Sequence, residues 1–176
     1  GAIIATGHSS NFLFILGNIM TARNLFDVEF YLNTYSDVAA SGVDPFTHYS
    51  LFGWREDRDP SAFFSTRFYK TVNADIKTAD INPLVHYVDF GVQELRDPSP
   101  FFDTSIYLSD NPDVANGATN PLEHFIAFGN EELRRANELF DTTFYLSNNA
   151  DVAFFVNSKQ TTAFDHFMLF GHKEGR

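Results

Sequence analysis

The sequence contains no cysteine among its 176 residues. It therefore has no disulfide framework, no thiolate metal site and no cysteine nucleophile. Basic residues are also few, because 12 Lys and Arg stand against 23 Asp and Glu, which gives a formal net charge of −11. A surface of this charge repels phosphate groups, and this excludes a general nucleic-acid-binding protein.

Long hydrophobic runs are scarce as well. The most apolar stretch covers only residues 12–20, whereas a membrane-spanning helix needs about 20 apolar residues, so we expect no membrane span. No basic residue precedes this stretch and no Ala-x-Ala site follows it. We interpret it as buried core and not as a signal peptide. The overall hydrophobic share of 44% is sufficient for a packed core.

The dominant feature of the chain is an internal repeat of 38 residues. Each unit begins with a Phe and a small polar residue, continues through a Tyr and an Asp-Val or Asp-Ile pair, and ends with His, Gly and Arg positions. The last unit carries four extra residues, which we place in 154–162 as a surface loop or an extended helix. The matched residues are Phe26, Phe64, Phe102 and Phe140; Tyr31, Tyr69, Tyr107 and Tyr145; His48, His86, His124 and His166; Gly53, Gly91, Gly129 and Gly171; and Arg58, Arg96, Arg134 and Arg176.

The repeat predicts both the fold class and the domain organisation. No segment alternates polar and apolar residues as a strand does, so we expect an all-α fold of tandem three-short-helix repeats. A single unit is too small to bury its aromatic face, and stacking the units solves this problem. Residues 1–176 should therefore form one domain, a compact array. Its parts are an N-terminal capping half unit (1–25) and repeats at 26–61, 62–99, 100–137 and 138–176.

The first two helices of a unit have clear start signals. Asp27 is expected to be the N-cap of the first helix, which places Phe26 and Tyr31 at the two positions of a hydrophobic staple. The same pairing recurs in the other three units. The second helix is expected to start at the Asn-Pro-Asp sequence of residues 111–113 and at its counterparts, because Asn caps helices and Pro suits the first helical position.

The third helix is expected to start at the Asp-Pro pair of residues 44–45 and at its counterparts. Phe46, Tyr49 and Phe52 are three residues apart, so we expect them to share one face and to point inward. Gly53 and its counterparts are expected to adopt the left-handed conformation that commonly ends a helix.

The four in-register histidines raise the question of a metal site or of acid–base catalysis. Packed helices lie about 8–10 Å apart, whereas each His ligand of a zinc ion lies about 2.0–2.1 Å from it. Histidines of neighbouring units therefore do not converge on one ion, and we expect no metal site. We interpret each His as structural, hydrogen-bonded to a loop carbonyl or to the recurring Asp of the second helix. The matched Phe, Tyr and Gly residues are assigned structural roles as well.

Cationic and aromatic residues near the unit ends are the candidate ligand-binding residues. A ladder of Arg side chains would fit an anion or an acidic sugar. The alternative is that these side chains form salt bridges to nearby glutamates and interact with helix C-termini. The single Trp would stack on a sugar ring or a partner, or else cover the neighbouring unit. The candidates are Trp54, Arg55, Arg58, Arg96, Arg134 and Arg135.

No cofactor is expected. The Asp-rich loops, such as residues 110–113, offer oxygen ligands for calcium. Each of these aspartates also has a helix-capping role, so calcium binding stays the less favoured alternative. The sequence has no HExxH, no GxSxG, no phosphate-cradling Gly loop and no Ser/His/Asp order. We therefore expect no enzymatic activity.

The pattern Phe-Asp…Tyr-Leu…Asn-Pro-Asp-Val-Ala…Asn-Pro-Leu-x-His-Phe…Phe-Gly…Glu-x-x-Arg is clearest in residues 102–134, and Gly-x-x-Glu-Gly-Arg occupies residues 171–176. This pattern resembles a tandem helical repeat of bacterial secreted or cell-surface proteins, which often stands beside calcium-binding RTX repeats or beside glycosyltransferase domains. The resemblance covers residues 26–176 and implies an extracellular or cell-surface location in a bacterium. The Gly-Gly-x-Gly-x-Asp nonapeptide of RTX repeats is absent, so their calcium binding is not implied here.

The resulting hypothesis is a non-enzymatic binding or structural module that acts in adhesion or in protein–protein interaction. It would recognise a partner protein or a cell-surface glycan through a repeated edge, with many weak contacts that match a repetitive ligand. The alternative is an accessory domain that holds acceptor glycan for a polysaccharide-modifying enzyme. We also expect the last unit to favour head-to-tail self-association, because an open stack exposes its final apolar face.

Overall fold

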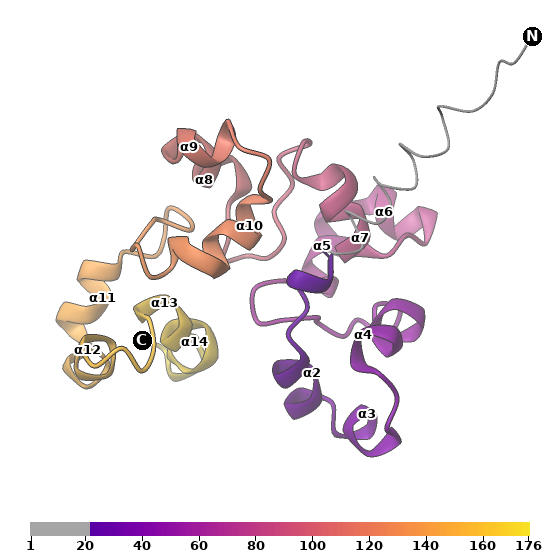
Figure 1. Cartoon of the computed structure of the whole chain (residues 1–176), viewed down its shortest axis with the longest axis horizontal. Helices are drawn as coiled ribbons and strands as arrows, with labels where there is room; N and C mark the ends of the chain where they lie inside the picture. Colours follow the sequence, from indigo (N-terminus) through magenta and orange to yellow (C-terminus); the bar gives the residue numbers. More distant parts are fainter. Residues whose placement is uncertain (1–21) are drawn as a thin grey trace, which may run out of the picture.

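Short α-helices joined by tight turns make up residues 22–176, the part of the chain that the computed structural model describes (Figure 1). Within these residues the only β-type pairings are isolated bridges, between Ser61 and Phe64 and between Ser99 and Phe102. The predicted all-α fold class is confirmed. The predicted half unit at 1–25 lies almost entirely outside the described residues. None of the described helices is both long enough and apolar enough to cross a membrane.

Each unit contributes three helices, and the third changes its winding halfway from α to π. The first unit contains α2 (Val28–Thr34), α3 (Ser36–Ser41), α4 (Pro45–His48) and the π-helix η1 (Tyr49–Gly53). The second contains α5 (Thr66–Val72), α6 (Ala74–Ala79), α7 (Pro83–His86) and η2 (Tyr87–Gly91). The third contains α8 (Thr104–Asp110), α9 (Pro112–Ala115), α10 (Pro121–His124) and η3 (Phe125–Gly129). The fourth contains α11 (Thr142–Asn148), α12 (Ala150–Asn157), α13 (Ala163–His166), η4 (Phe167–Gly171) and α14 (His172–Glu174).

The first helices start as the sequence predicts. Their N-cap side chains accept hydrogen bonds from backbone N–H groups of the first turn, and these residues are Asp27, Ser65, Asp103 and Asp141. The ring centroid of Phe26 lies 5.0 Å from that of Tyr31, and the equivalent pairs of the other units lie 5.5, 5.1 and 5.2 Å apart. The hydrophobic staple is therefore confirmed in every unit.

The π-winding overturns the prediction that Phe46, Tyr49 and Phe52 all point inward. The N–H of Trp54 donates to the carbonyl of Tyr49 at 3.2 Å, and the next two units repeat this bond at 3.0 and 2.9 Å. The extra residue in the turn rotates Phe52 away from the face of Tyr49. Tyr49 is 0% exposed and Phe46 is half-buried, whereas Phe52 is 57% exposed.

The prediction that Gly53 and its counterparts are left-handed is also wrong. Their counterpart Gly171, for example, has φ −57°, which is ordinary right-handed backbone. A β-carbon at Gly53 would overlap the hydroxyl of Tyr31, and the other units show the same close approach. Glycine is therefore required by the tyrosine that packs against it. The left-handed position falls four residues later, at Asp57, Leu95, Leu133 and Gly175.

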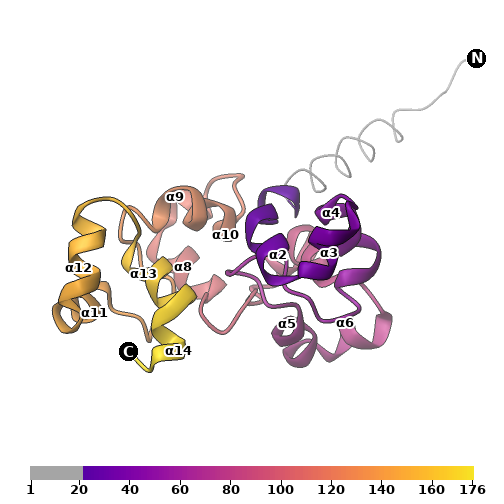
Figure 2. The same ribbon diagram turned by 90° about the horizontal axis from the view of Figure 1, so that it is seen from below.

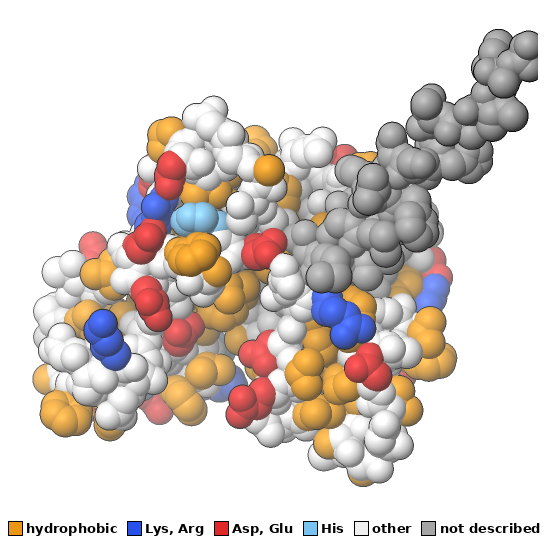
Figure 3. Space-filling view, viewed as in Figure 1, with side chains coloured by type: hydrophobic (Ala, Val, Ile, Leu, Met, Phe, Trp, Pro, Cys, Tyr) orange, Lys and Arg blue, Asp and Glu red, His pale blue; other side chains and the backbone are white. Residues whose placement is uncertain are grey.

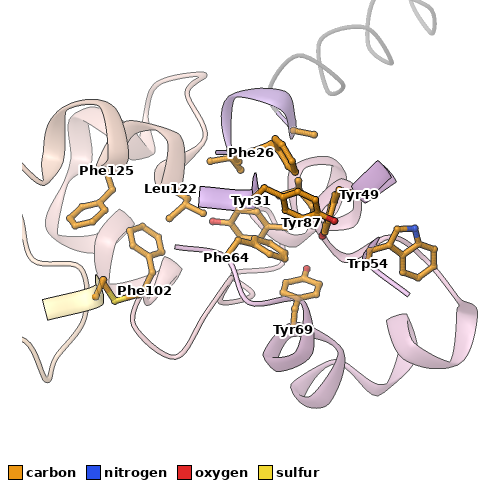
Figure 4. Close-up of a cluster of buried hydrophobic side chains, with 14 of the residues drawn as sticks. Phe26, Tyr31, Tyr49, Trp54, Phe64, Tyr69, Tyr87, Phe102, Leu122 and Phe125 are labelled. Carbon is orange, nitrogen blue, oxygen red and sulfur yellow. The ribbon is translucent and has the colours of Figure 1, made fainter. Parts of the chain in front are cut away.

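The units pack on one another through their third helices and the loops before their first helices. The ring of Phe63 lies 6.3 Å from that of Phe125 and 6.1 Å from that of Phe164, in the next unit and the next but one. The amide of Asn24 donates to Glu123 of the third unit at 2.6 Å. The first two units form one half of the array and the last two form the other half (Figures 1 and 2). Buried aromatic side chains from both halves approach this contact (Figure 4).

The four extra residues of the last unit lengthen its second helix. α12 has eight residues, whereas α3 and α6 have six each. A turn with a left-handed Lys159 comes next. Residues 154–157 belong to the extended helix and residues 158–162 to the turn that follows, so each of the two predicted structures accounts for part of 154–162.

Candidate functional site: the Phe–His row

Each recurring histidine is hydrogen-bonded to the recurring tyrosine of its own unit. The hydroxyl of Tyr31 lies 3.1 Å from Nδ1 of His48, and the same pair in each of the other units is 2.9 Å apart. The partner is thus a tyrosine hydroxyl and not the loop carbonyl or second-helix Asp that we predicted. These Tyr–His pairs tie the first helix of each unit to its third helix. The pairs are Tyr31–His48, Tyr69–His86, Tyr107–His124 and Tyr145–His166.

Burial keeps the tyrosines of these pairs protonated. It raises the pKa of Tyr107 to about 12, and it raises the pKa of the other three above the ordinary value. Burial also lowers the pKa of His86, and the nearby guanidinium of Arg96 adds to this effect. A neutral imidazole carries a hydrogen on one ring nitrogen and accepts at the other. Nε2 of His86 lies 4.0 Å from the carboxylate of Glu94.

An exposed phenylalanine lies beside every one of these histidines. It stands four residues after the His on the third helix, and the ring centroids are 6.0, 5.6, 5.6 and 5.5 Å apart along the chain. Between 53% and 57% of each phenylalanine is exposed. We call these residues the Phe–His row: Phe52, Phe90, Phe128 and Phe170, with His48, His86, His124 and His166.

The sequence did not predict this exposed row, because its pattern favours a buried Phe52. The recurrence of a Phe directly before each recurring Gly is the sequence feature that identifies the row. Figure 3 shows one histidine on the face in view, close to α10, with a hydrophobic side chain against it and acidic and basic side chains nearby. His48, His124 and His166 are half-buried beside their phenylalanines, whereas His86 is only 7% exposed.

The recurring arginines form salt bridges within their own units. Arg96 donates to Asp75 through both terminal nitrogens at 2.9 and 2.8 Å, and its Nε contacts Glu94 at 2.6 Å. Arg58, Arg134 and Arg176 make equivalent pairs with the second-helix Asp and the nearby Glu of their own units. The salt-bridge interpretation of these arginines agrees with the structure. The second-helix Asp is a partner that we had not predicted.

Trp54 is buried, whereas Arg55 and Arg135 are half-exposed and paired with aspartates. Only 4% of Trp54 is exposed, its Nε1 donates to the Ser50 carbonyl, and the Arg55 guanidinium lies 4.0 Å from the centre of its ring. Arg55 also pairs with Asp80 at 2.9 Å. The buried indole is closed to a sugar ring, so the interpretation of Trp54 as a stacking platform is corrected. Arg135 pairs with Asp110 at 2.7 Å.

Val92 and Asn130 are the counterparts of Trp54 in the second and third units. Each lies beside a groove at the junction with the next unit. One groove of about 510 Å³ lies beside Val92, and a second of about 450 Å³ lies beside Asn130. Thr119 lines the first groove and its counterpart Thr161 lines the second, so the two grooves are equivalent places. Within residues 22–176 no group of three or more His, Asp or Glu side chains is arranged to hold a metal ion.

Comparison with known proteins adds no family to this picture. The chain matches no family model, no curated protein and no solved structure.

Proposed function

We propose that this chain is a non-enzymatic binding module that holds an elongated cell-surface glycan through the Phe–His row. The C–H face of a sugar ring is apolar and packs well on an aromatic face. Its hydroxyl groups need donors and acceptors at the rim, a combination typical of ligand sites. In the second unit Phe90 supplies the aromatic face and the half-exposed carboxylate of Glu94 supplies an acceptor, whereas His86 is only 7% exposed.

The exposure of the same phenylalanine in all four units carries this proposal. Burying a Phe side chain stabilises a protein by about 1.5–3 kcal/mol relative to leaving it exposed. The array forgoes this gain at Phe52, Phe90, Phe128 and Phe170. A single exposed Phe is ordinary on a protein surface, but four in register indicate a surface that is kept for contact.

Repetition of the site in every unit also raises the overall affinity for a repetitive ligand, even if each single contact is weak. Once one sugar of a chain is held, the next contact is intramolecular, so avidity exceeds the affinity of any one site by about 10²–10⁴-fold when the spacings match. A polysaccharide has such a repeating spacing. The resemblance of residues 26–176 to bacterial surface repeats supports an extracellular ligand of this kind. A partner protein with repeated apolar contacts is the other candidate.

The test compares a row variant with a control variant on an array of bacterial surface polysaccharides. The row variant changes Phe52, Phe90, Phe128 and Phe170 to Ala. The control changes Val28, Val43 and Val72 to Ala, which are 50%, 44% and 55% exposed and lie outside the row. We expect the wild type and the control to bind the same glycans, and the row variant to bind roughly 100-fold more weakly or not at all.

Two outcomes would overturn the proposal. If the row variant binds as well as the wild type, the row is not the site. If the wild type retains no glycan but captures a protein in a row-dependent way, the ligand class is wrong. A salt titration distinguishes the row from an Arg edge, because stacking on Phe and hydrogen bonds to an uncharged sugar change little with ionic strength.

A further inference from the structure

The residue before each staple Phe becomes more exposed along the chain. Leu25, at the start of the first unit, is 1% exposed. Its counterparts Phe63 and Phe101 are half-buried. Leu139, the counterpart in the fourth unit, is 93% exposed. An almost fully exposed Leu at a position that is otherwise covered requires a structural explanation.

The covering groups come from units further along the chain. Phe63 packs on Phe125 of the third unit and on Phe164 of the fourth. Phe101 packs on Phe167 and His172 of the fourth unit, at 5.8 and 5.5 Å. Each of these residues is thus covered by the third helix, or its extension, of a later unit. Within residues 22–176 no unit comes after the one that contains Leu139, and this accounts for its exposure.

The backbone at the start of each unit is bonded to the last residues of that unit, just before the next one begins. The N–H of Asp27 donates to the Pro60 carbonyl at 2.9 Å, near the boundary with the second unit. The equivalent bonds are Ser65 N–H to Pro98 at 3.0 Å and Asp103 N–H to Ala136 at 2.9 Å. The counterpart of these acceptors for Asp141 falls past Arg176.

The uncovered surface is apolar and hollowed. Phe144 is 70% exposed, although its counterparts Phe30, Phe68 and Ile106 are half-buried. A groove of about 340 Å³ lies there, and Phe101, Leu139, Phe140 and Phe144 are among its lining residues. We call these four residues the end face.

We propose that the end face is a docking surface for the third helix of a further repeat unit of the same sequence pattern. The internal interfaces fix the expected contacts. The residue equivalent to Phe125 in that unit would cover Leu139, and the residue equivalent to Leu122 would cover Phe101. The residues that lead into that unit would supply the carbonyl that accepts from Asp141.

A second copy of this chain does not offer a matching surface. In its first two units, the residues that would have to meet the end face are already closed. Tyr49 is 0% exposed and Leu84 is 1% exposed. Arg23 covers Phe46 with its guanidinium 4.6 Å from the ring centre. These contacts argue against the head-to-tail association of copies that the sequence suggested.

The test extends the chain in register by adding a copy of residues 97–134 after Arg176. The copy of Pro98 then supplies the backbone acceptor for Asp141, and the third helix of the copy reaches the end face. Leu139→Ala is measured in the original and in the extended chain by thermal unfolding. We expect a shift below about 1 °C in the original chain and a loss of roughly 4–10 °C in the extended one, as for a core Leu truncation in a chain of this size.

A matched extension, in which the copies of Leu122 and Phe125 are changed to Ser, should remove that difference. Equal effects of Leu139→Ala in the original and extended chains would overturn the proposal. An added unit that brings no gain in helical circular dichroism would overturn it as well. Sedimentation of the original chain tests a second copy as the occupant, because a dimer that Leu139→Asp dissociates would contradict our assignment.

Discussion

Two rows of phenylalanine run through the array with the same period and opposite surroundings. The staple row is buried in the first three units, with 7%, 1% and 2% exposure at Phe26, Phe64 and Phe102, and Phe140 at the end face is half-buried. The phenylalanines of the Phe–His row are more than half exposed in every unit. The staple residue precedes an N-cap and packs on its tyrosine, whereas the other residue lies in a π-turn that rotates it outward. Recurrence alone therefore does not separate residues that hold a repeat together from residues that contact a ligand.

The first unit offers the largest contrast between the two environments, because Phe52 and Trp54 stand two residues apart. We expect Trp54→Ala to lower the free energy of unfolding by about 3–5 kcal/mol, since it empties a buried site. Phe52→Ala should cost far less. Urea denaturation of both variants measures the difference. Similar losses for the two would show that exposure does not report the role of these side chains.

The close contact of glycine and tyrosine behind the exposed row gives the next effect. We expect Gly91→Ala to cost about 1–3 kcal/mol, because its methyl group would overlap the hydroxyl of Tyr69. Tyr69→Phe alone should cost about 1 kcal/mol through the lost hydrogen bond to His86. In the double variant the overlap is relieved, so the combined loss should be smaller than the sum. Simple additivity in this cycle would contradict the steric explanation.

The half-buried carboxyl group of Asp59, at the junction of the first two units, should have a smaller effect on the free energy of unfolding, and this effect depends on pH. Burial raises the pKa of Asp59 to about 6, although its Oδ1 accepts a hydrogen bond from the Thr66 N–H. The ordinary pKa of Asp is about 3.9, so between these values the folded state binds more protons than the unfolded state. The contribution of Asp59 is therefore favourable at low pH and is lost as the pH rises from about 4 to about 6.

Asp59→Asn keeps the acceptor oxygen and cannot ionise. We expect it to raise the free energy of unfolding near pH 7 by about 1 kcal/mol and to have little effect at pH 4. Asp37→Asn is the matched control with the opposite sign. The hydrogen bond from the guanidinium of Arg58 lowers the pKa of Asp37 to about 2. Ionised Asp37 therefore stabilises the folded state at pH values above its ordinary pKa, and Asp37→Asn should lower the free energy of unfolding near pH 7. A loss of stability in Asp59→Asn at pH 7 would contradict this account.

Most of the fold can be derived from local signals in the sequence. The N-caps at Asp27 and Asp103 and the staple pairs obey known capping rules, and the Phe, His and Gly positions fix the period. The Tyr–His pair was also within reach of the sequence, because the two residues keep a constant separation in the first three units. The sequence offered no reason, however, to prefer a tyrosine over a carbonyl as the partner of each histidine.

The π-turn was not accessible from sequence reasoning, and both mistakes at the third helix result from it. Residues 49–53 have an ordinary apolar pattern, so an α-helix with a glycine end was the natural expectation. The structure shows a wider turn that admits the tyrosine hydroxyl against Gly53 and turns Phe52 to the surface. A feature that depends on the approach of a distant side chain is not encoded in helix propensity.

The third junction illustrates the same limit. Arg135 stands where Asp59 and Asp97 stand in the first two junctions, where these aspartates accept from the N–H of Thr66 and Thr104. Here the turn is held instead by Asn137, whose amide donates to the Phe101 carbonyl. Equivalent backbone is thus reached with different side chains, which sequence matching alone does not reveal.

We expect the staple row to stabilise the array and the phenylalanines of the Phe–His row to contribute little to its stability. The most direct test is the free energy of unfolding of Phe64→Ala and of Phe90→Ala, measured side by side in urea. We expect a loss of about 3–5 kcal/mol for Phe64→Ala and of less than about 1 kcal/mol for Phe90→Ala. Equal losses in the two variants would show that the exposed row is part of the core and would contradict its role as a binding surface.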